Sequence, residues 1–362
     1  MKFLITGNMG YVGPSVVKQL RRSYPDATID GVDIAFFAQC LTTRRSIPER
    51  HLDRQYFRDV RDLADADLAD YDAVILLAAI SNDPMGERFR DITLAINRDA
   101  AVEIGHAAAR AGVRNLVFAS SCSVYGIADG GARREHDPVN PMTAYAQSKI
   151  GAERGLAEID SDMVITCLRF ATACGMSDRL RLDLVLNDFV ACALTTGRIT
   201  VLSDGTPWRP LIDVSDMARA IEWAATRSAD NGGQFLVVNA GADSANYQVR
   251  DLARAVAAAV PGCTVSINEQ APVDSRSYRV DFGLFSQLAP DHLPLRTLED
   301  SIGDLVAGLQ EIRFSDGDFH TSDFIRLQVL KSLVAHGALS DNFGWADGAL
   351  GRKPKVLEEI HA

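Results

Sequence analysis

The chain opens with Lys2-Phe3-Leu4-Ile5-Thr6 and continues with Gly7-Asn8-Met9-Gly10-Tyr11-Val12-Gly13. The apolar run over residues 3–6 predicts a short buried strand, and the amphipathic stretch over residues 12–23 predicts the helix that follows it. Three glycines with the spacing G-x-x-G-x-x-G lie between them, where they let the turn close and let a ligand diphosphate approach the main chain. Free N–H groups at the start of the helix favour the same anion. This stretch therefore predicts a doubly wound α/β fold, the Rossmann fold, with a dinucleotide at its first turn.

Asp33 indicates which dinucleotide binds. It ends the second predicted strand, over residues 28–33, and stands 20 residues after Gly13. A carboxylate at this place accepts hydrogen bonds from both ribose hydroxyls and repels the 2′-phosphate of NADP. The predicted cofactor is therefore NAD.

Other strand ends add candidate cofactor contacts. Asp59 follows an extended segment over residues 55–58 and is a candidate partner for the adenine amine, while small residues end the strand over 73–78. Asn97 lies inside a long predicted helix, where a cofactor-facing and a solvent-facing amide fit the pattern equally. The residues expected at the cofactor from these segments are Gly7, Met9, Gly10, Tyr11, Val12, Gly13, Asp33, Asp59, Val60, Leu77, Ala78, Ala79 and Asn97.

The rest of the chain continues the strand–helix alternation and then changes. Apolar runs over 73–78, 115–120 and 164–170 predict further strands, and residues 92–111 and 144–158 predict the long helices between them. Strands that are apolar throughout are typical of a parallel sheet covered on both faces. We expect a Rossmann domain over 1–174, to which 210–258 returns, and a smaller mixed α/β substrate lobe over 175–209 and 259–362. Within that lobe, residues 315–345 are a lid, a dimer arm or a specificity element.

Charge and composition exclude several partners. Lys and Arg total 37 against 48 Asp and Glu, which gives a formal charge of -11 and disfavours nucleic acid and anionic membranes. No apolar run reaches membrane-spanning length and no leader pattern is present, so a cytoplasmic protein is expected. The six cysteines form no C-x-x-C pair, which predicts free thiols, and the seven histidines have no metal-ligand spacing, so no metal site is predicted.

Tyr145 and Lys149 are the first candidates for chemistry. They are four residues apart in a predicted helix, which puts the phenol and the ammonium group on one face. A free phenol has a pKa of about 10, and a neighbouring cation together with the charge of the nicotinamide lowers such a pKa by two or three units. This spacing is common, but Ser120 to Ser123 stand at the carboxyl end of a predicted strand, where a doubly wound sheet binds its ligands. A serine hydroxyl there orients a substrate hydroxyl toward the tyrosine.

Taken together, the motifs resemble the extended short-chain dehydrogenase/reductase family, and within it the NAD-dependent nucleotide-sugar epimerases and dehydratases. In chain order they are Thr-Gly-x-x-Gly-x-x-Gly at 6–13, the acid Asp33, Leu-Ala-Ala at 77–79, Ser-x-x-Val-Tyr-Gly ending at Gly126, Tyr-x-x-x-Lys at 145–149, Leu-Arg-Phe at 168–170 and Arg-Pro-Leu-Ile-Asp-Val-Ser-Asp at 209–216. The resemblance covers roughly residues 1–285. It implies a nucleotide-diphosphate sugar as the substrate and a homodimer formed through the helices over 92–111 and 144–158.

The resemblance also implies roles for individual residues. Ser121, Tyr145 and Lys149 match the catalytic triad, with Tyr145 as the base and Lys149 also at the nicotinamide ribose. Arg209 and Arg276 match the positions that grip the substrate diphosphate. The other residues expected at the ligands are Ser120 and Phe170 for the cofactor, and Ser81, Ser123, Thr172 and Asn187 for the substrate.

One departure from the family pattern bears on the reaction. Sugar 4,6-dehydratases of this family carry Asp-Glu directly after the catalytic hydroxyl residue, whereas this chain has Cys122-Ser123. The prediction is therefore an epimerase, with a keto-sugar reductase or dehydrogenase, a dehydratase and an idle NAD-binding scaffold as alternatives. Cys122 is either a reactive thiol or a small packing residue. The small-residue face Ala101, Ile104, Ala107, Ala108 and Ala111 either forms the dimer interface or packs on the sheet.

Overall fold

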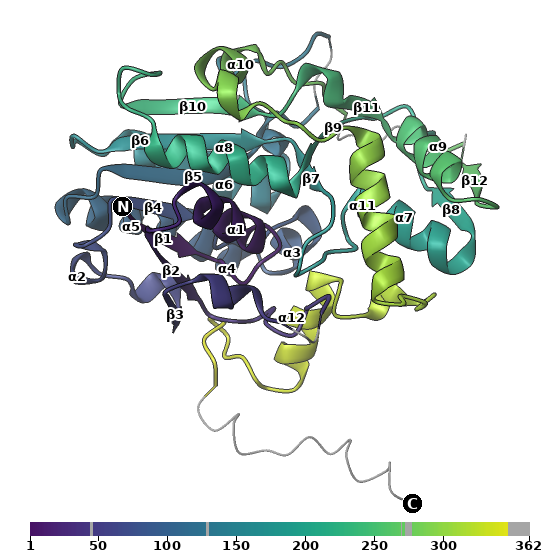
Figure 1. Cartoon of the computed structure of the whole chain (residues 1–362), viewed down its shortest axis with the longest axis horizontal. Coiled ribbons are helices and arrows are strands. Elements are labelled where there is room, and N and C mark those ends of the chain that lie inside the picture. Colours follow the sequence, from purple (N-terminus) through teal and green to yellow (C-terminus); the bar gives the residue numbers. More distant parts are fainter. Residues whose placement is uncertain (44–45, 128–129, 269, 272–276, 347–362) are drawn as a thin grey trace, which may run out of the picture.

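The fold is built on a seven-stranded parallel sheet with the strand order β10-β6-β5-β4-β1-β2-β3 (Figure 1). The computed structural model describes residues 1–43, 46–127, 130–268, 270–271 and 277–346. The strands are β1 (Lys2–Thr6), β2 (Thr28–Asp33), β3 (Arg54–Phe57), β4 (Ala73–Leu76), β5 (Asn115–Ser121), β6 (Val164–Phe170) and β10 (Phe235–Ala240). β1 pairs with β2 on one side and β4 on the other, so the strand order reverses there. The predicted doubly wound fold is confirmed, and this reversal point is where such sheets bind ligands.

Helices cover both faces of the sheet. α1 (Gly13–Ser23) and α8 (Val214–Thr226) share a core with Phe3 and Ile5 on one face. On the other face, α5 (Ala101–Arg110) and α6 (Ala144–Ala157) share a core with Leu4 and Val74. The shorter helices α2 (Asp65–Leu68), α3 (Asp83–Arg88) and α4 (Arg90–Leu94) lie on this same face and pack against α5 and α6. Successive side chains of β1 are buried in cores on opposite faces of the sheet, which explains why the strand is apolar throughout.

The second lobe holds two small sheets. One has the order β11 (Asn246–Gln248), β9 (Trp208–Asp213), β7 (Thr172–Cys174), and the other pairs β8 (Arg198–Val201) with β12 (Thr264–Ile267). Its helices α7 (Val185–Thr196), α9 (Val249–Ala259) and α11 (Leu298–Glu311) share a third core. Of the segment 210–258 expected on the first domain, α8 and β10 reach the large sheet, whereas α9 packs on α7 and α11.

The end of the described chain returns to the first lobe. Figure 1 shows α12 (Arg326–Ala335) below α3, which it contacts, and away from α9 and β12. Leu330, Leu339 and Phe343 are buried in the same core as Val32 and Phe36. α10 (Gly283–Leu288) likewise lies beside β10. Residues 259–362 were expected in the substrate lobe, but these segments pack on the dinucleotide domain because their apolar side chains complete its cores.

The helix predicted over 92–111 is interrupted. A π-helical turn, Ala95–Ala100, separates α4 from α5. The side chains of Ala101, Ile104, Ala107 and Ala108 are buried in the core that covers β5, and Ala111 packs against it, so the alternative in which this face packs on the sheet is confirmed. The homodimer stays a prediction.

Three glycines bring α5 and α6 into close contact. A Cβ on Gly155 would lie 2.6 Å from Val102 Cγ2, and one on Gly105 would lie 2.5 Å from Leu156 Cδ2. A Cβ on Gly151 would lie 2.8 Å from Arg98 Cδ in the π-helical turn. The helix that carries Tyr145 and Lys149 is therefore seated against its neighbour with no room for larger side chains.

Two further expectations concern the surface and the thiols. Within the described residues, no helix combines the length and the apolar character needed to cross a membrane. All six cysteines are free, as predicted, and four of them are buried.

Candidate active site

A cavity of about 590 Å³ lies at the carboxyl ends of β1, β4 and β5, and side chains of both lobes line it. The first lobe contributes the glycine turn and the ends of the strands, and the second contributes residues of α7, β8 and β9. A cavity at this place has room for a dinucleotide on one side and a second ligand on the other.

The glycine turn has the shape that a bound diphosphate requires. Gly7 has φ +72°, and a Cβ on it would lie 2.4 Å from the main-chain nitrogen of Ala78. Gly10 lines the cavity, and a Cβ on it would meet only the carbonyl oxygen of Gly7, at 3.2 Å. The main chain at Gly10 is therefore open toward a ligand, as the predicted NAD site needs. Met9 and Gly13 do not line the cavity; a Cβ on Gly13 would lie 2.1 Å from the Asn8 carbonyl oxygen, so these residues shape the turn.

The two glycines predict different variant phenotypes. Gly7→Ala should lower the free energy of unfolding by about 2 kcal/mol or more, because the left-handed backbone and the contact with Ala78 both oppose a side chain. Gly10→Ala should have a free energy of unfolding within about 0.5 kcal/mol of that of the wild type. It should still lose NAD affinity, because its methyl group extends into the cavity. Chemical denaturation and NAD titration of both variants check this. Equal stability of the two variants would contradict the role given to Gly7.

Asp33 lines the cavity beside the glycine turn, and its contact with the ribose of NAD stays a prediction. Its carboxylate accepts hydrogen bonds from the main-chain N–H groups of Met9 (3.0 Å) and Ala35 (2.7 Å). Burial raises the pKa of this carboxyl, and these two hydrogen bonds oppose that rise. The side chain is thus held in place and lines the cavity.

The other predicted cofactor contacts divide into two groups. Asp59, Val60, Leu77, Ala78, Ala79 and Phe170 line the cavity, as do Tyr11 and Val12. The Asp59 carboxylate is already bound by the Arg61 guanidinium, at 2.6 Å. Asn97 does not line the cavity and is 1% exposed, so neither reading of this residue is correct. Its amide accepts a hydrogen bond from the Ile80 N–H (2.8 Å) and donates to the Ile80 carbonyl (3.0 Å), which fixes the cavity wall from behind.

Ser121, Tyr145 and Lys149 lie together on one wall, as the resemblance implied. Ser121 ends β5, and Tyr145 and Lys149 occupy the first two turns of α6, whose N-terminus is capped by the Thr143 hydroxyl. The Tyr145 phenol is hydrogen-bonded to Ser121. Lys149 Nζ donates to the Ala119 carbonyl (2.7 Å) and lies 5.6 Å from the centre of the Tyr145 ring.

Burial dominates the electrostatics of this wall. Burial, followed by the charge of Asp83, raises the pKa of Tyr145 to about 12, although the hydrogen bond with Ser121 lowers it. Burial also lowers the pKa of Lys149 to about 8. In the protein alone, desolvation outweighs the lowering of the phenol pKa by Ser121 and Arg181; the prediction concerns the complex with the charged nicotinamide and stays a prediction. Ionisation of Tyr145 therefore depends on charge that the ligands bring.

A buried ion pair supports the wall from beneath. Glu153 accepts a hydrogen bond from Ser120 Oγ (2.5 Å) and pairs with the Arg169 guanidinium (2.7 Å). Ser120, predicted at the cofactor, lines the cavity but uses its hydroxyl here. Sequence reasoning missed Glu153, although its position four residues after Lys149 places it on the same face of the helix. Cys122 is fully buried, does not line the cavity and donates to the Arg169 carbonyl, which is the packing alternative.

The predicted substrate residues are also brought together in part. Ser81, Ser123, Thr172 and Arg209 line the cavity, and the buried Ser123 hydroxyl has no hydrogen-bond partner within the described residues. Asn187 is buried away from the cavity, where its amide accepts from the Gly175 N–H (3.0 Å) and donates to the Tyr11 hydroxyl (3.2 Å). It therefore supports the turn rather than the substrate. Arg276 lies outside the described residues.

Sequence reasoning missed several charged residues in this cavity. Arg181 donates to Ser81 Oγ (2.8 Å) and pairs with Asp183 (2.8 Å), and its charge lowers the pKa of Tyr145. The alternating run Arg179-x-Arg181-x-Asp183 in an otherwise apolar stretch was the available signal. Tyr278 and Arg326 also line the cavity, from segments that carry no motif.

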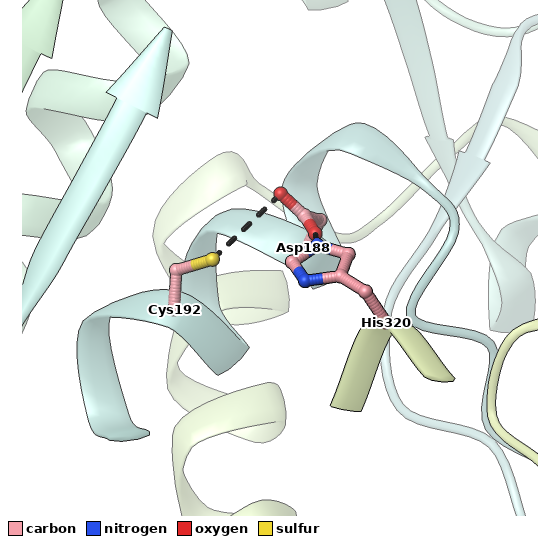
Figure 2. A group of neighbouring side chains, drawn as sticks. All are labelled: Asp188, Cys192 and His320. Carbon is pink, nitrogen blue, oxygen red and sulfur yellow. Dashed lines mark hydrogen bonds and ion pairs between the residues drawn. The ribbon is translucent and has the colours of Figure 1, made fainter. Parts of the chain in front are cut away.

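A group of three potential metal ligands lies at the cavity edge, although no histidine spacing predicted one. Figure 2 shows Asp188 and Cys192 on α7 with His320 facing them from the neighbouring segment. His320 Nε2 lies 2.6 Å from Asp188 Oδ1, and Cys192 Sγ lies 3.9 Å from Asp188 Oδ2. Among these residues, only Asp188 lines the cavity. The hydrogen bond between His320 and Asp188 accounts for their contact without an ion.

Known proteins match this chain in sequence and in fold. A model of the NAD dependent epimerase/dehydratase family matches residues 3–241. The dTDP-glucose 4,6-dehydratase of Streptomyces griseus is 25% identical over 289 residues, which are 77% of this chain and 85% of that protein. The UDP-glucose 4-epimerase of Mycolicibacterium smegmatis is 25% identical over 279 residues, 72% of this chain and 83% of that protein.

Solved structures agree with these relatives. MoeE5 in complex with UDP-glucose and NAD superposes with a TM-score of 0.72 at 26% identity, covering 86% of this chain and 99% of its own. TunA, an NAD-dependent NDP-hexosamine 5,6-dehydratase, has the same fold, with a TM-score of 0.74 at 24% identity over 88% of this chain and 99% of its own. The family model spans the glycine turn, Asp33 and the Ser121–Tyr145–Lys149 wall. The chain therefore belongs to the NAD-dependent epimerase/dehydratase family, and NAD is its cofactor.

Proposed function

We propose that the protein epimerises a nucleotide-diphosphate sugar by transient oxidation to a keto-sugar. The observation that carries the proposal is the wall of Ser121, Tyr145 and Lys149 in a cavity that both lobes line, with Cys122 and Ser123 where dehydratases of the family have an acid pair. Cys122 is buried away from the cavity, and burial raises the pKa of its thiol. Neither residue supplies the acid that water loss requires.

The residues have separate roles in this reaction. NAD supplies reversible hydride acceptance when it is bound. Ser121 orients the sugar hydroxyl toward the Tyr145 oxygen, and Tyr145 removes its proton while the hydride leaves the same carbon. The charge of Lys149 and that of the nicotinamide stabilise the phenolate. The proton returns from Tyr145 after the keto-sugar has turned to present its other face.

The second lobe would hold the nucleotide part of the substrate. Arg209 comes from β9, lines the cavity and has the planar guanidinium that suits a diphosphate. Asp33 disfavours NADP, which weighs against a reductase that consumes it. Because some of the similar proteins are dehydratases, loss of water from the sugar is the second candidate reaction.

Product analysis in heavy water distinguishes these reactions. The purified protein is incubated with UDP- and dTDP-linked hexoses, and the products are followed by NMR, by mass and by the absorbance of reduced nicotinamide. We expect an epimer that carries no deuterium on carbon, has the mass of its substrate and leaves no net reduced nicotinamide. A product lighter by one water would establish a dehydratase, and stoichiometric reduction of the cofactor would establish a net redox enzyme. A complete lack of turnover with every sugar would favour the scaffold. Tyr145→Phe is the matched inactive control.

A further inference from the structure

Arg326 is a buried cation that the site described above does not use. It is the first residue of α12, only 1% exposed, and it lines the cavity although it lies far along the chain from the glycine turn. Its guanidinium donates to two main-chain carbonyls, those of Asp323 (3.2 Å) and Arg179 (2.9 Å). It is also hydrogen-bonded to the thiol of Cys40.

The other buried arginines nearby are neutralised and Arg326 is not. Arg179 pairs with Glu49 at 2.6 Å, and Arg181 pairs with Asp183 at 2.8 Å. Within the part of the chain that the structure describes, Arg326 forms no ion pair with a carboxylate. Burial, together with the charges of Arg181 and Arg179, lowers the pKa of its guanidinium to about 10, although Cys40 and Asp183 oppose this shift. A buried cation without a counter-ion is costly, and an anionic ligand in the cavity would remove that cost.

The surroundings of Arg326 indicate which anion it meets. Its guanidinium lies 5.0 Å from the centre of the Phe37 ring, which follows Asp33 by four residues and also lines the cavity. The Arg179 carbonyl that Arg326 contacts lies in the loop that begins at Ser177, whose hydroxyl donates to the Tyr11 carbonyl in the glycine turn (2.7 Å). Arg326 therefore contacts the loop after Asp33 and also the loop that is bonded to the glycine turn.

The segment that carries Arg326 is attached to the same part of the site. We call residues 319–345 the C-terminal arm. The Cys40 thiol donates to the Asp323 carbonyl (3.2 Å), and the Trp345 indole donates to the Ile34 carbonyl (2.8 Å). The Phe343 ring packs between Phe36 and Phe89, with ring centres 6.1 and 4.9 Å apart. Three of these four contacts fall on the loop after Asp33, whose residues Ile34, Phe36 and Phe37 line the cavity.

We propose that Arg326 binds the diphosphate of NAD, so that the C-terminal arm closes the cofactor site after NAD has entered. The arm lies beyond the segment that the family model matches, which ends at residue 241. The inference needs the NAD site alone and does not depend on the reaction proposed above. NAD then leaves only when the arm detaches from the loop after Asp33, and its release is slow.

Binding measurements on nucleotide-free protein test the diphosphate contact. Arg326→Gln is titrated with ADP-ribose, which carries the diphosphate, and with adenosine, which does not. We expect the affinity for ADP-ribose to fall about 10- to 100-fold, as for the loss of a buried charge-assisted contact, and the affinity for adenosine to change less than about twofold. Lys331→Gln removes a charge from the exposed face of the same helix and should change neither affinity.

Two outcomes would overturn the proposal. An equal loss for both ligands would mean that Arg326 only supports the loop, and an unchanged affinity for ADP-ribose would mean that it does not meet the diphosphate. If the glutamine variant does not fold, Arg326→Lys keeps the charge without the two-pronged geometry and should lose several-fold in ADP-ribose affinity alone. Trp345→Ala, which frees the arm without changing Arg326, should raise the NAD dissociation rate several-fold in stopped-flow experiments. An unchanged NAD dissociation rate would contradict the proposal that the C-terminal arm closes the cofactor site.

Discussion

Tyr145→Phe should lower kcat about 10²- to 10⁴-fold and leave NAD affinity within about twofold of the wild type. The phenol oxygen is the only group of Tyr145 that exchanges a proton, and the ring that remains fills the same space beside Lys149. Steady-state turnover of the sugar that proves active and NAD titration check this. Retained turnover would contradict the role of Tyr145 as the base.

A second buried tyrosine provides the matched control. Tyr278 lines the same cavity, and burial raises the pKa of its phenol, so it is a plausible competitor for the role. Tyr278→Phe should keep turnover within about tenfold of the wild type, because no lysine or serine of the catalytic wall is bonded to it. A loss as large as that of Tyr145→Phe would transfer the proton-exchange role to Tyr278.

Lys149→Met should make the protein more stable and inactive. Burial lowers the pKa of Lys149 from 10.5 to about 8, which corresponds to about 3 kcal/mol of unfavourable charge burial. Methionine removes that cost but loses the hydrogen bond to Ala119, worth about 1 kcal/mol, so a net gain of about 2 kcal/mol is expected at pH 7. Turnover should fall by a factor comparable to that of Tyr145→Phe, because the ammonium group that stabilises the phenolate together with the nicotinamide is then lost.

The pH dependence of that gain gives the decisive test. In the wild type, both the folded and the unfolded states carry a protonated Lys149 below about pH 8, so the full cost is present there. The cost shrinks as the pH rises from about 8 toward 10.5, where the lysine is neutral in both states. Denaturation of the two proteins across this range should show their stabilities converging. A difference that stays constant with pH would contradict the charge-burial explanation.

The fold was largely predictable because its first half follows strict patterns. The strands Thr28–Asp33 and Val164–Phe170 begin and end where the apolar runs do, and the alternation with helices predicts a parallel sheet. The π-helical turn Ala95–Ala100 has no local pattern that predicts it, and neither do the hydrogen bonds that join its Asn97 to the main chain of Ile80. The return of α12 to the first lobe depends on long-range packing of apolar side chains that could pack on either lobe.

The site was predictable where residues contribute through local geometry. Gly7, Gly10, Asp33, Tyr145 and Lys149 all lie where the spacing and the strand ends placed them. Asn187 and Asn97 lie beside the site but do not line the cavity. Sequence spacing could not predict this, because it does not specify the direction in which a side chain points. Tertiary contacts bring Arg181 and Arg326 into the cavity from segments without a motif. The pKa of the Tyr145 phenol depends mainly on how deeply the side chain is buried, and the Tyr-x-x-x-Lys spacing gives no information about burial.

The close seating of α6 on α5 has a mechanical consequence. Gly151 and Gly155 leave little space between α6 and the helical segment before it, so we expect the wall that carries Tyr145 to move less than the second lobe when a ligand enters. A reaction in which the keto-sugar presents first one face and then the other needs room to turn. We therefore expect that movement in the opposite wall, the lobe of α7 and β8, with the wall of Tyr145 as the fixed side of the cavity.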